Sequence, residues 1–209
     1  MDSYSLTHKA IPLKLPLFLT ISRIFISPIF LIFYLKYEQL GIPFHILPLI
    51  LIFLLAISEL SDFFDGYLAR RFHIVTRLGK ILDPMADSIT RLTILLTFTQ
   101  GVIQIPLLLI FVFIYRDAMI NTLRTACALE GVVLAARTSG KIKSVVQAIA
   151  IFCVLILLLA YAWKMIALDS LRMISLYVIA VAAGYTFYSG AEYIYTHRAV
   201  IRKHWEKDS

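Results

Sequence analysis

Long apolar runs separated by short polar connections form the main pattern along this chain. Each run has about 17 to 25 residues, which is enough for an α-helix to cross roughly 30 Å of hydrocarbon. The pattern therefore predicts an all-α membrane protein with six transmembrane helices. The runs cover residues 16–36, 46–68, 80–100, 105–128, 142–163 and 171–195.

A single membrane domain is expected, because no internal repeat, low-complexity tract or linker interrupts these runs. The domain covers residues 16–196, between a juxtamembrane segment at 1–15 and a cytoplasmic tail at 197–209. In the juxtamembrane segment Lys9 and Lys14 stand among apolar residues, which is typical of a helix lying on anionic headgroups, and a disordered leader is the alternative. The first apolar run has no small-residue cleavage site after it, so we interpret it as a retained helix.

Basic residues are concentrated in alternate connections, which sets the orientation in the membrane. Cytoplasmic connections of membrane proteins carry an excess of Lys and Arg. We therefore expect both termini to be cytoplasmic in a multi-pass protein of a bacterial inner membrane. The basic residues that carry this expectation are Lys9, Lys14, Arg70, Arg71, Arg77, Lys80, Arg137, Lys141, Lys143, Arg198, Arg202, Lys203 and Lys207.

Composition agrees with a membrane location. Hydrophobic residues make up 60% of the chain, charged residues 16%, and the mean hydropathy is +0.85, which excludes an ordinary water-soluble domain. The formal net charge of +7 is assigned to contacts with anionic membrane lipids, since no nucleic-acid-binding motif is present. Cys127 and Cys153 both fall inside apolar runs, where a cysteine acts as a small hydrophobe.

Acidic residues cluster around the connection between the second and third runs. Asp62 and Asp65 are three residues apart and Asp83 and Asp87 four apart, so each pair shares one face of a helix. A tight turn would bring both pairs together, and four carboxylates repel one another unless cations lie between them. Oxygen ligands of this kind suit Mg²⁺ or Mn²⁺, and two ions are expected. One such pair alone is more often a solvated helix end, but the combined spacing favours a metal site.

The metal site and the small residues beside it together predict a substrate that is a phosphate-bearing nucleotide. A metal held by carboxylates usually takes its remaining ligands from substrate phosphate. Gly66, Ala69 and Gly79 would let a nucleotide lie against the backbone, and Arg70 would face its phosphates.

The pattern Asp-x-x-Asp-Gly-x-x-Ala-Arg, eight residues, Gly-x-x-x-Asp-x-x-x-Asp resembles the motif of the CDP-alcohol phosphotransferase family. It matches without a gap, and the six-helix architecture of that family agrees with the run count. The resemblance implies that Asp62, Asp65 and Asp83 ligate metal, with Asp87 at the second metal or acting as base. It also implies a CDP-binding site, which is extended by a likeness at the start of the first run and comprises Thr20, Arg23, Asp62, Gly66, Ala69, Arg70 and Gly79.

The likeness continues almost to the end of the chain, through Arg116-Asp117, Arg124, Gly140-Lys141-x-Lys143, Gln147 and Tyr188-Ser189-Gly190. Within the family it resembles members that act on CDP-diacylglycerol and sn-glycerol 3-phosphate. Two positions depart from their pattern: Leu17, where Asn is usual, and Ser88, where Lys is usual. Arg91 lies one turn beyond Asp87, so it either replaces the missing cation or marks a different acceptor.

An acceptor that carries a phosphate dianion needs fixed cations near the aspartates. Arg116, Arg124, Lys141 and Arg91 are the candidates. Lys143, which opens the fifth run together with Lys141, is a further candidate, with snorkelling to headgroups as the alternative. For Arg116 the alternative is an internal pair with Asp117.

The expected function is metal-dependent transfer of a phosphatidyl group from CDP-diacylglycerol to glycerol 3-phosphate, with Asp87 accepting the proton of the attacking hydroxyl. The products are phosphatidylglycerophosphate and CMP. The same chemistry with inositol phosphate, serine or another alcohol is the first alternative. A cation transporter is the second, because acids in membrane helices also mark ion paths. The resemblance also implies a possible homodimer.

Overall fold

The structure is a computed structural model that describes residues 15–71, 77–129 and 137–205. Inside its helices, the side chains of residues 15–20, 63, 65–71, 77–83, 129 and 199–205 lie outside the description. Six α-helices make up the described chain, which confirms the expected all-α class. They are α1 (Leu15–Lys36), α2 (Leu47–Arg71), α3 (Arg77–Thr97), α4 (Leu107–Leu129), α5 (Thr138–Ala162) and α6 (Leu168–Trp205).

Each expected apolar run corresponds to one helix, and the main difference is at the end of α6. The expected run stops at residue 195, whereas α6 continues as far as Trp205. The continuation carries basic residues, which end an apolar pattern without ending a helix. The first nine residues of the predicted tail, 197–205, are therefore helical.

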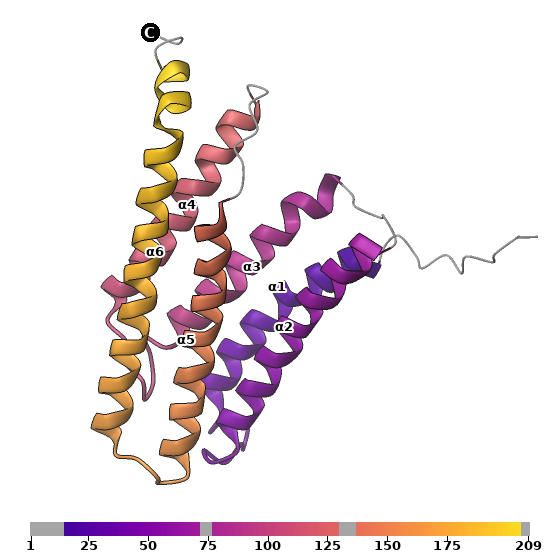
Figure 1. Cartoon of the computed structure of the whole chain (residues 1–209). Coiled ribbons are helices and arrows are strands. Elements are labelled where there is room, and N and C mark those ends of the chain that lie inside the picture. The colour runs from indigo at the N-terminus through magenta and orange to yellow at the C-terminus, as the bar shows by residue number, and fades with distance from the viewer. Residues whose placement is uncertain (1–14, 72–76, 130–136, 206–209) are drawn as a thin grey trace, which may run out of the picture.

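The helices form two neighbouring groups (Figure 1). In the first group α1 packs against α2 and α3, and in the second α6 packs against α4 and α5. Contacts of α5 with α2 and α3, and of α3 with α4, join the groups. Residues of α4 and α5 can therefore approach one another beside α3, which contacts both helices.

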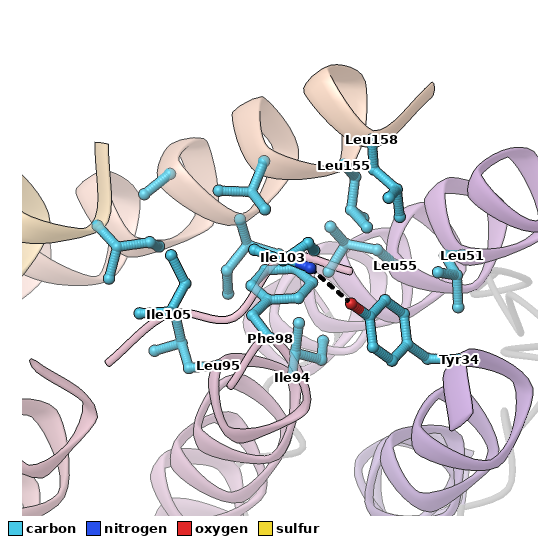
Figure 2. Packing of buried hydrophobic residues seen from close by; sticks show 14 of the residues in the cluster. Tyr34, Leu51, Leu55, Ile94, Leu95, Phe98, Ile103, Ile105, Leu155 and Leu158 are labelled. Atoms are coloured by element: carbon cyan, nitrogen blue, oxygen red, sulfur yellow. Dashed lines mark hydrogen bonds between the residues drawn. The ribbon is translucent and has the colours of Figure 1, made fainter. Parts of the chain in front are cut away.

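A buried apolar cluster holds the groups together, and Figure 2 shows part of it. Tyr34 of α1 lies at its edge, where its hydroxyl donates to the carbonyl of Gln100 at 3.0 Å and accepts from the backbone N–H of Ile103 at 3.4 Å. Gly101 has a positive φ of 65°, and a Cβ at this position would lie 2.8 Å from Cε1 of Tyr34. Only glycine fits there, so the connection between α3 and α4 is closely bound to α1.

Buried polar side chains occupy the other half of the bundle. Along α3 the buried residue Thr90 precedes the apolar residues Ile94 and Leu95, and along α5 Lys143 and Gln147 precede the apolar stretch from Ala150 to Leu158. Since the start of α3 and the start of α5 were both expected on the cytoplasmic side, this half contains the predicted site.

Two helices of the described chain are long and apolar enough to cross a membrane, within Thr138–Ala162 and Leu168–Arg198. In α4 the charged residues Arg116, Asp117 and Arg124 interrupt the apolar stretch. Large apolar side chains are nevertheless exposed on every helix, and an apolar exterior of this extent suits contact with lipid. Examples, one from each helix in order, are Phe25, Phe53, Leu96, Leu108, Ile156 and Val181.

Candidate active site

Two of the predicted metal ligands meet at one arginine. Arg23 of α1 is 1% exposed, and its Nη1 donates to Oδ1 of Asp62 in α2 and, at 2.5 Å, to Oδ1 of Asp87 in α3. Two carboxylates that reach the same nitrogen atom lie within a few ångströms of each other. The donor set is therefore of the kind that binds a hard divalent cation, and its charge is balanced here by a guanidinium.

The other two predicted ligands are placed only by their backbone. Asp65 lies in α2, one turn after Asp62, and Asp83 lies in α3, one turn before Asp87. Their side chains lie outside the description. Among the side chains that the structure does describe, no three Asp, Glu, His or Cys residues gather around one point. A metal site of four aspartates thus stays a prediction. The positions of Asp62 and Asp87, which meet at Arg23, are consistent with it.

Arg91 lies on the far side of Asp87. Its Nη1 is 3.8 Å from Oδ2 of Asp87, and its Nη2 is 3.7 Å from Oε2 of Glu59 in α2. Glu59 was not among the residues predicted from the sequence, although its position three residues before Asp62 puts it on the same helix face. Arg91 therefore contacts another acid as well as the predicted base.

A polar cavity of about 200 Å³ opens between α3, α4 and α5. All four predicted acceptor residues, Arg91, Arg116, Arg124 and Lys141, line it together with Asp87. The four basic residues are up to 50 positions apart in the sequence, and the packing of the helices brings them to one cavity. The remaining lining residues are Pro84, Ser88, Asp117, Asn121, Arg137, Gly140, Lys143, Ser144 and Gln147.

Asp117 is the centre of a buried network in the wall of this cavity. Its carboxylate accepts from Nζ of Lys143 at 2.7 and 2.9 Å, from Nη1 of Arg116 at 3.0 Å and from Oγ of Ser88 at 2.9 Å. Lys143 is 5% exposed and pairs with this buried acid. The internal pair considered for Arg116 is present, and Arg116 also lines the cavity. One carboxylate thus ties α3, α4 and α5 together.

The path of Arg116 depends on Gly190 of α6. Its Nη2 donates to Oγ of Ser189 in α6 at 3.1 Å. A Cβ at Gly190 would lie 3.0 Å from Cγ of Arg116, and a Cβ at Gly140 would lie 3.5 Å from its Nη2. The arginine stem therefore passes across α6 where there is no side chain, which lets its head reach the cavity.

The remaining cations are held more loosely. Nε of Arg124 donates to the hydroxyl of Tyr193 at 3.1 Å, and the guanidinium lies 5.2 Å from the centre of that ring. Arg137 pairs with Glu192 of α6 at 2.9 Å. Lys141 is exposed at the start of α5. All three side chains line the cavity, and two of them are anchored to α6.

The predicted CDP-binding residues are described only in part. Arg23 and Asp62 pair with each other, as given above. Thr20, Gly66, Ala69, Arg70 and Gly79 lie in α1, α2 and α3, and their side chains lie outside the description. Their assignment to the nucleotide stays a prediction.

Comparisons of the sequence with known proteins point to one family. The family model described as CDP-alcohol phosphatidyltransferase matches residues 13–185. A protein of Rickettsia typhi is 33% identical over 185 residues, covering 86% of this chain and 97% of its own length. One of Bacillus subtilis is 34% identical over 151 residues, with 68% and 77% covered, and one of Sodalis glossinidius is 31% identical over 199 residues, with 92% and 99% covered. All three are named CDP-diacylglycerol–glycerol-3-phosphate 3-phosphatidyltransferase.

Proposed function

Because the chain belongs to the CDP-alcohol phosphatidyltransferase family, a family of membrane-associated transferases, we propose that it transfers a phosphatidyl group from CDP-diacylglycerol to sn-glycerol 3-phosphate. The products are phosphatidylglycerophosphate and CMP. The observation that carries this proposal is the polar cavity, in which cations from three helices face the same space as Asp87. The names of the relatives given above support the same pair of substrates.

The charge of the cavity favours an anionic acceptor. Six basic side chains line it, from Arg91, Arg116, Arg124, Arg137, Lys141 and Lys143, against the two acids Asp87 and Asp117. Lys143 and Arg116 already neutralise Asp117, so the positive charge left over is carried by residues at the wall and mouth. A phosphate dianion matches that excess through charge-assisted hydrogen bonds, whereas an acceptor without net charge, such as zwitterionic serine, does not.

Members of this family generally use divalent metal ions. In our proposal Asp62, Asp65, Asp83 and Asp87 hold Mg²⁺ or Mn²⁺, as two ions, and the convergence of Asp62 and Asp87 on Arg23 supports this fit. When bound, the ions would neutralise the pyrophosphate of the donor and stabilise the leaving CMP.

The protein side of the reaction is proton transfer and positioning. Asp87 lies both beside Arg23 and Asp62 and on the wall of the acceptor cavity, so it stands between the two substrates. It accepts the proton of the acceptor hydroxyl, directly or through water, as that oxygen bonds to the phosphorus that carries the lipid. The bond from this phosphorus to the CMP oxygen breaks, and Arg70 with the backbone at Gly66, Ala69 and Gly79 holds the departing nucleotide.

The proposal includes a placement in the membrane. All six helices cross it, both termini and the cavity mouth face the cytoplasm, and the bilayer is a bacterial inner membrane. The two long apolar helices and the apolar exterior of every helix support this placement. Anionic headgroups around the basic connections, and a second copy of the chain, are further proposed partners.

Release of CMP from CDP-diacylglycerol tests the function. We expect purified protein with Mg²⁺ or Mn²⁺ to release CMP when glycerol 3-phosphate is added, and to stop when a chelator removes the metal. Inositol phosphate, serine and glycerol are offered in parallel. Faster release with any of these would transfer the assignment to that acceptor, and metal-independent release would contradict the mechanism.

A further inference from the structure

A glutamine that the proposed chemistry does not use lies in the wall of the acceptor cavity. Gln147 of α5 is 2% exposed and lines this cavity. Its amide nitrogen Nε2 is buried and has no hydrogen-bond partner within the described part of the chain. Buried amide groups are nearly always paired in folded proteins, so a buried donor without a protein partner at a cavity wall is one that a ligand can satisfy.

Two other buried donors of residues that line this cavity, Nε of Arg91 and Nε of Arg116, have no hydrogen-bond partner among the described residues. Both belong to guanidinium groups, which are charged and best complemented by anionic oxygen. Gln147 is different, because its amide is neutral and pairs equally well with a neutral oxygen. The cavity therefore offers cations for a phosphate and, at Gln147, a buried neutral donor for another part of the same ligand.

The cations and the neutral amide lie at different positions along α5. Arg137 and Lys141 stand at the start of the helix, Lys143 follows, and Gln147 lies one turn deeper on the same face as Lys143. The buried residues that follow Gln147, from Ala150 onward, are apolar. Gln147 is thus the last polar residue before the apolar core, at the inner end of the cavity, whereas the exposed cations stand at its mouth.

We propose that Gln147 is a specificity-determining residue that donates its amide N–H to a hydroxyl oxygen of the acceptor. The inference rests on the proposed function and makes the acceptor class a polyol phosphate, with at least one hydroxyl besides the one that attacks. For sn-glycerol 3-phosphate the attacking group is the primary hydroxyl. The group that Gln147 binds is then the secondary hydroxyl on the central carbon.

The test compares two acceptors that differ only in that group. sn-Glycerol 3-phosphate and 3-hydroxypropyl phosphate share the phosphate and the primary hydroxyl, but the second lacks the secondary hydroxyl. We expect kcat/KM of the wild-type protein to be about fivefold to tenfold higher for glycerol 3-phosphate, the worth of one buried hydrogen bond. In Gln147→Met, which keeps the length of the side chain and removes the donor, this ratio should fall close to one.

A matched control makes the same chemical change outside the cavity. Gln100 is exposed in the connection between α3 and α4, so Gln100→Met should keep the wild-type ratio. Gln147→Leu serves as a second variant if Gln147→Met does not fold. The ratio separates contact with the substrate from a structural role, because a structural defect lowers kcat/KM for both acceptors equally.

The outcomes are distinguishable. A wild-type protein that uses both acceptors equally well, or a Gln147 variant that loses both to the same extent, overturns the role of Gln147 and leaves the proposed function intact. A wild-type protein that transfers to neither phosphate overturns the proposed function, and the role of Gln147 falls with it.

Discussion

The ammonium nitrogen of Lys143 lies 2.7 Å from Oδ1 and 2.9 Å from Oδ2 of Asp117, so a buried ion pair joins α5 to α4 in the wall of the acceptor cavity. Both residues are almost fully buried, at 5% and 6% exposure. Removing one partner of such a pair leaves an uncompensated buried charge, whereas removing both does not.

The first prediction follows from this pair. Asp117→Asn should lower the free energy of unfolding by about 3 kcal/mol or more, because it leaves the buried Lys143 without its counter-ion. Lys143→Met should lower it by less, because Arg116 still pairs with Asp117. The double variant should lose clearly less than the sum of the two. Thermal unfolding in detergent without substrate measures all three. Losses that simply add would show that the two side chains do not depend on each other.

The second prediction concerns the aspartates. Asp62→Asn, Asp65→Asn and Asp83→Asn should each reduce CMP release by more than about a hundredfold, because even the partners that orient a metal ligand change activity by roughly 10- to 100-fold. Each variant should still extract and migrate as a folded protein. Asp169→Asn is the control, since Asp169 is exposed in the first turn of α6. Substantial turnover at saturating Mg²⁺ in any one of the three would remove that residue from the ligand set.

The third prediction separates the two substrates. Neutralising Arg116, Arg124 or Lys141 should raise KM for glycerol 3-phosphate about tenfold to a hundredfold, since charge-assisted hydrogen bonds contribute about 1.5 to 3 kcal/mol each. Arg70→Gln should instead raise KM for CDP-diacylglycerol. Lys36→Gln, at an exposed residue in the last turn of α1, should change neither. Equal increases in both KM values would show that the cavity does not distinguish the substrates.

The fourth prediction uses two glycines of α6. Gly190→Ala should raise KM for glycerol 3-phosphate about fivefold, because its Cβ would press on Cγ of Arg116 and small displacements of a binding group are costly. Gly184→Ala is the matched control on the same helix, where a Cβ would meet nothing within 4 Å. It should leave KM unchanged and slightly stabilise the helix. If both variants behaved alike, the path of Arg116 would not limit acceptor binding.

The fifth prediction concerns Arg91 and Ser88. Ser88 occupies the position where similar members of the family usually have Lys. Its hydroxyl donates to Asp117 in the wall of the cavity that Arg91 also lines. Arg91→Leu should strongly lower transfer, and adding Ser88→Lys should partly restore it by returning a positive charge to the cavity. An Arg91→Leu protein with normal kinetics would mean that Arg91 serves mainly as the partner of Glu59.

The helices were predictable from the sequence because each is built on an apolar run long enough to be recognised without its neighbours. The pairing of Arg23 with Asp62 and Asp87 was not predictable in the same way. Those residues are 39 and 64 positions apart, and only the packing of α1 against α2 and α3 brings them together.

The acceptor cavity shows the same limit. Arg116, Arg124 and Lys141 were found as charges near or inside apolar runs, but their common wall depends on how α4 and α5 each pack against α3 and α6. Gln147 carried a weaker signal, as a single polar residue four positions after Lys143 in an apolar helix. A neutral side chain of this kind becomes informative only when its burial and its missing partner are known.

The division of the bundle into two helix groups has a consequence for how the reaction specificity can change. Arg23, Asp62 and the predicted donor site belong to α1, α2 and α3, whereas most of the acceptor cavity belongs to α4 and α5. On the proposed assignment, one group carries out the chemistry and the other selects the alcohol. Grafting α4 and α5 from a relative with a different acceptor, while keeping Ser88 matched to Asp117, would then exchange the head group of the product and leave the catalytic half untouched.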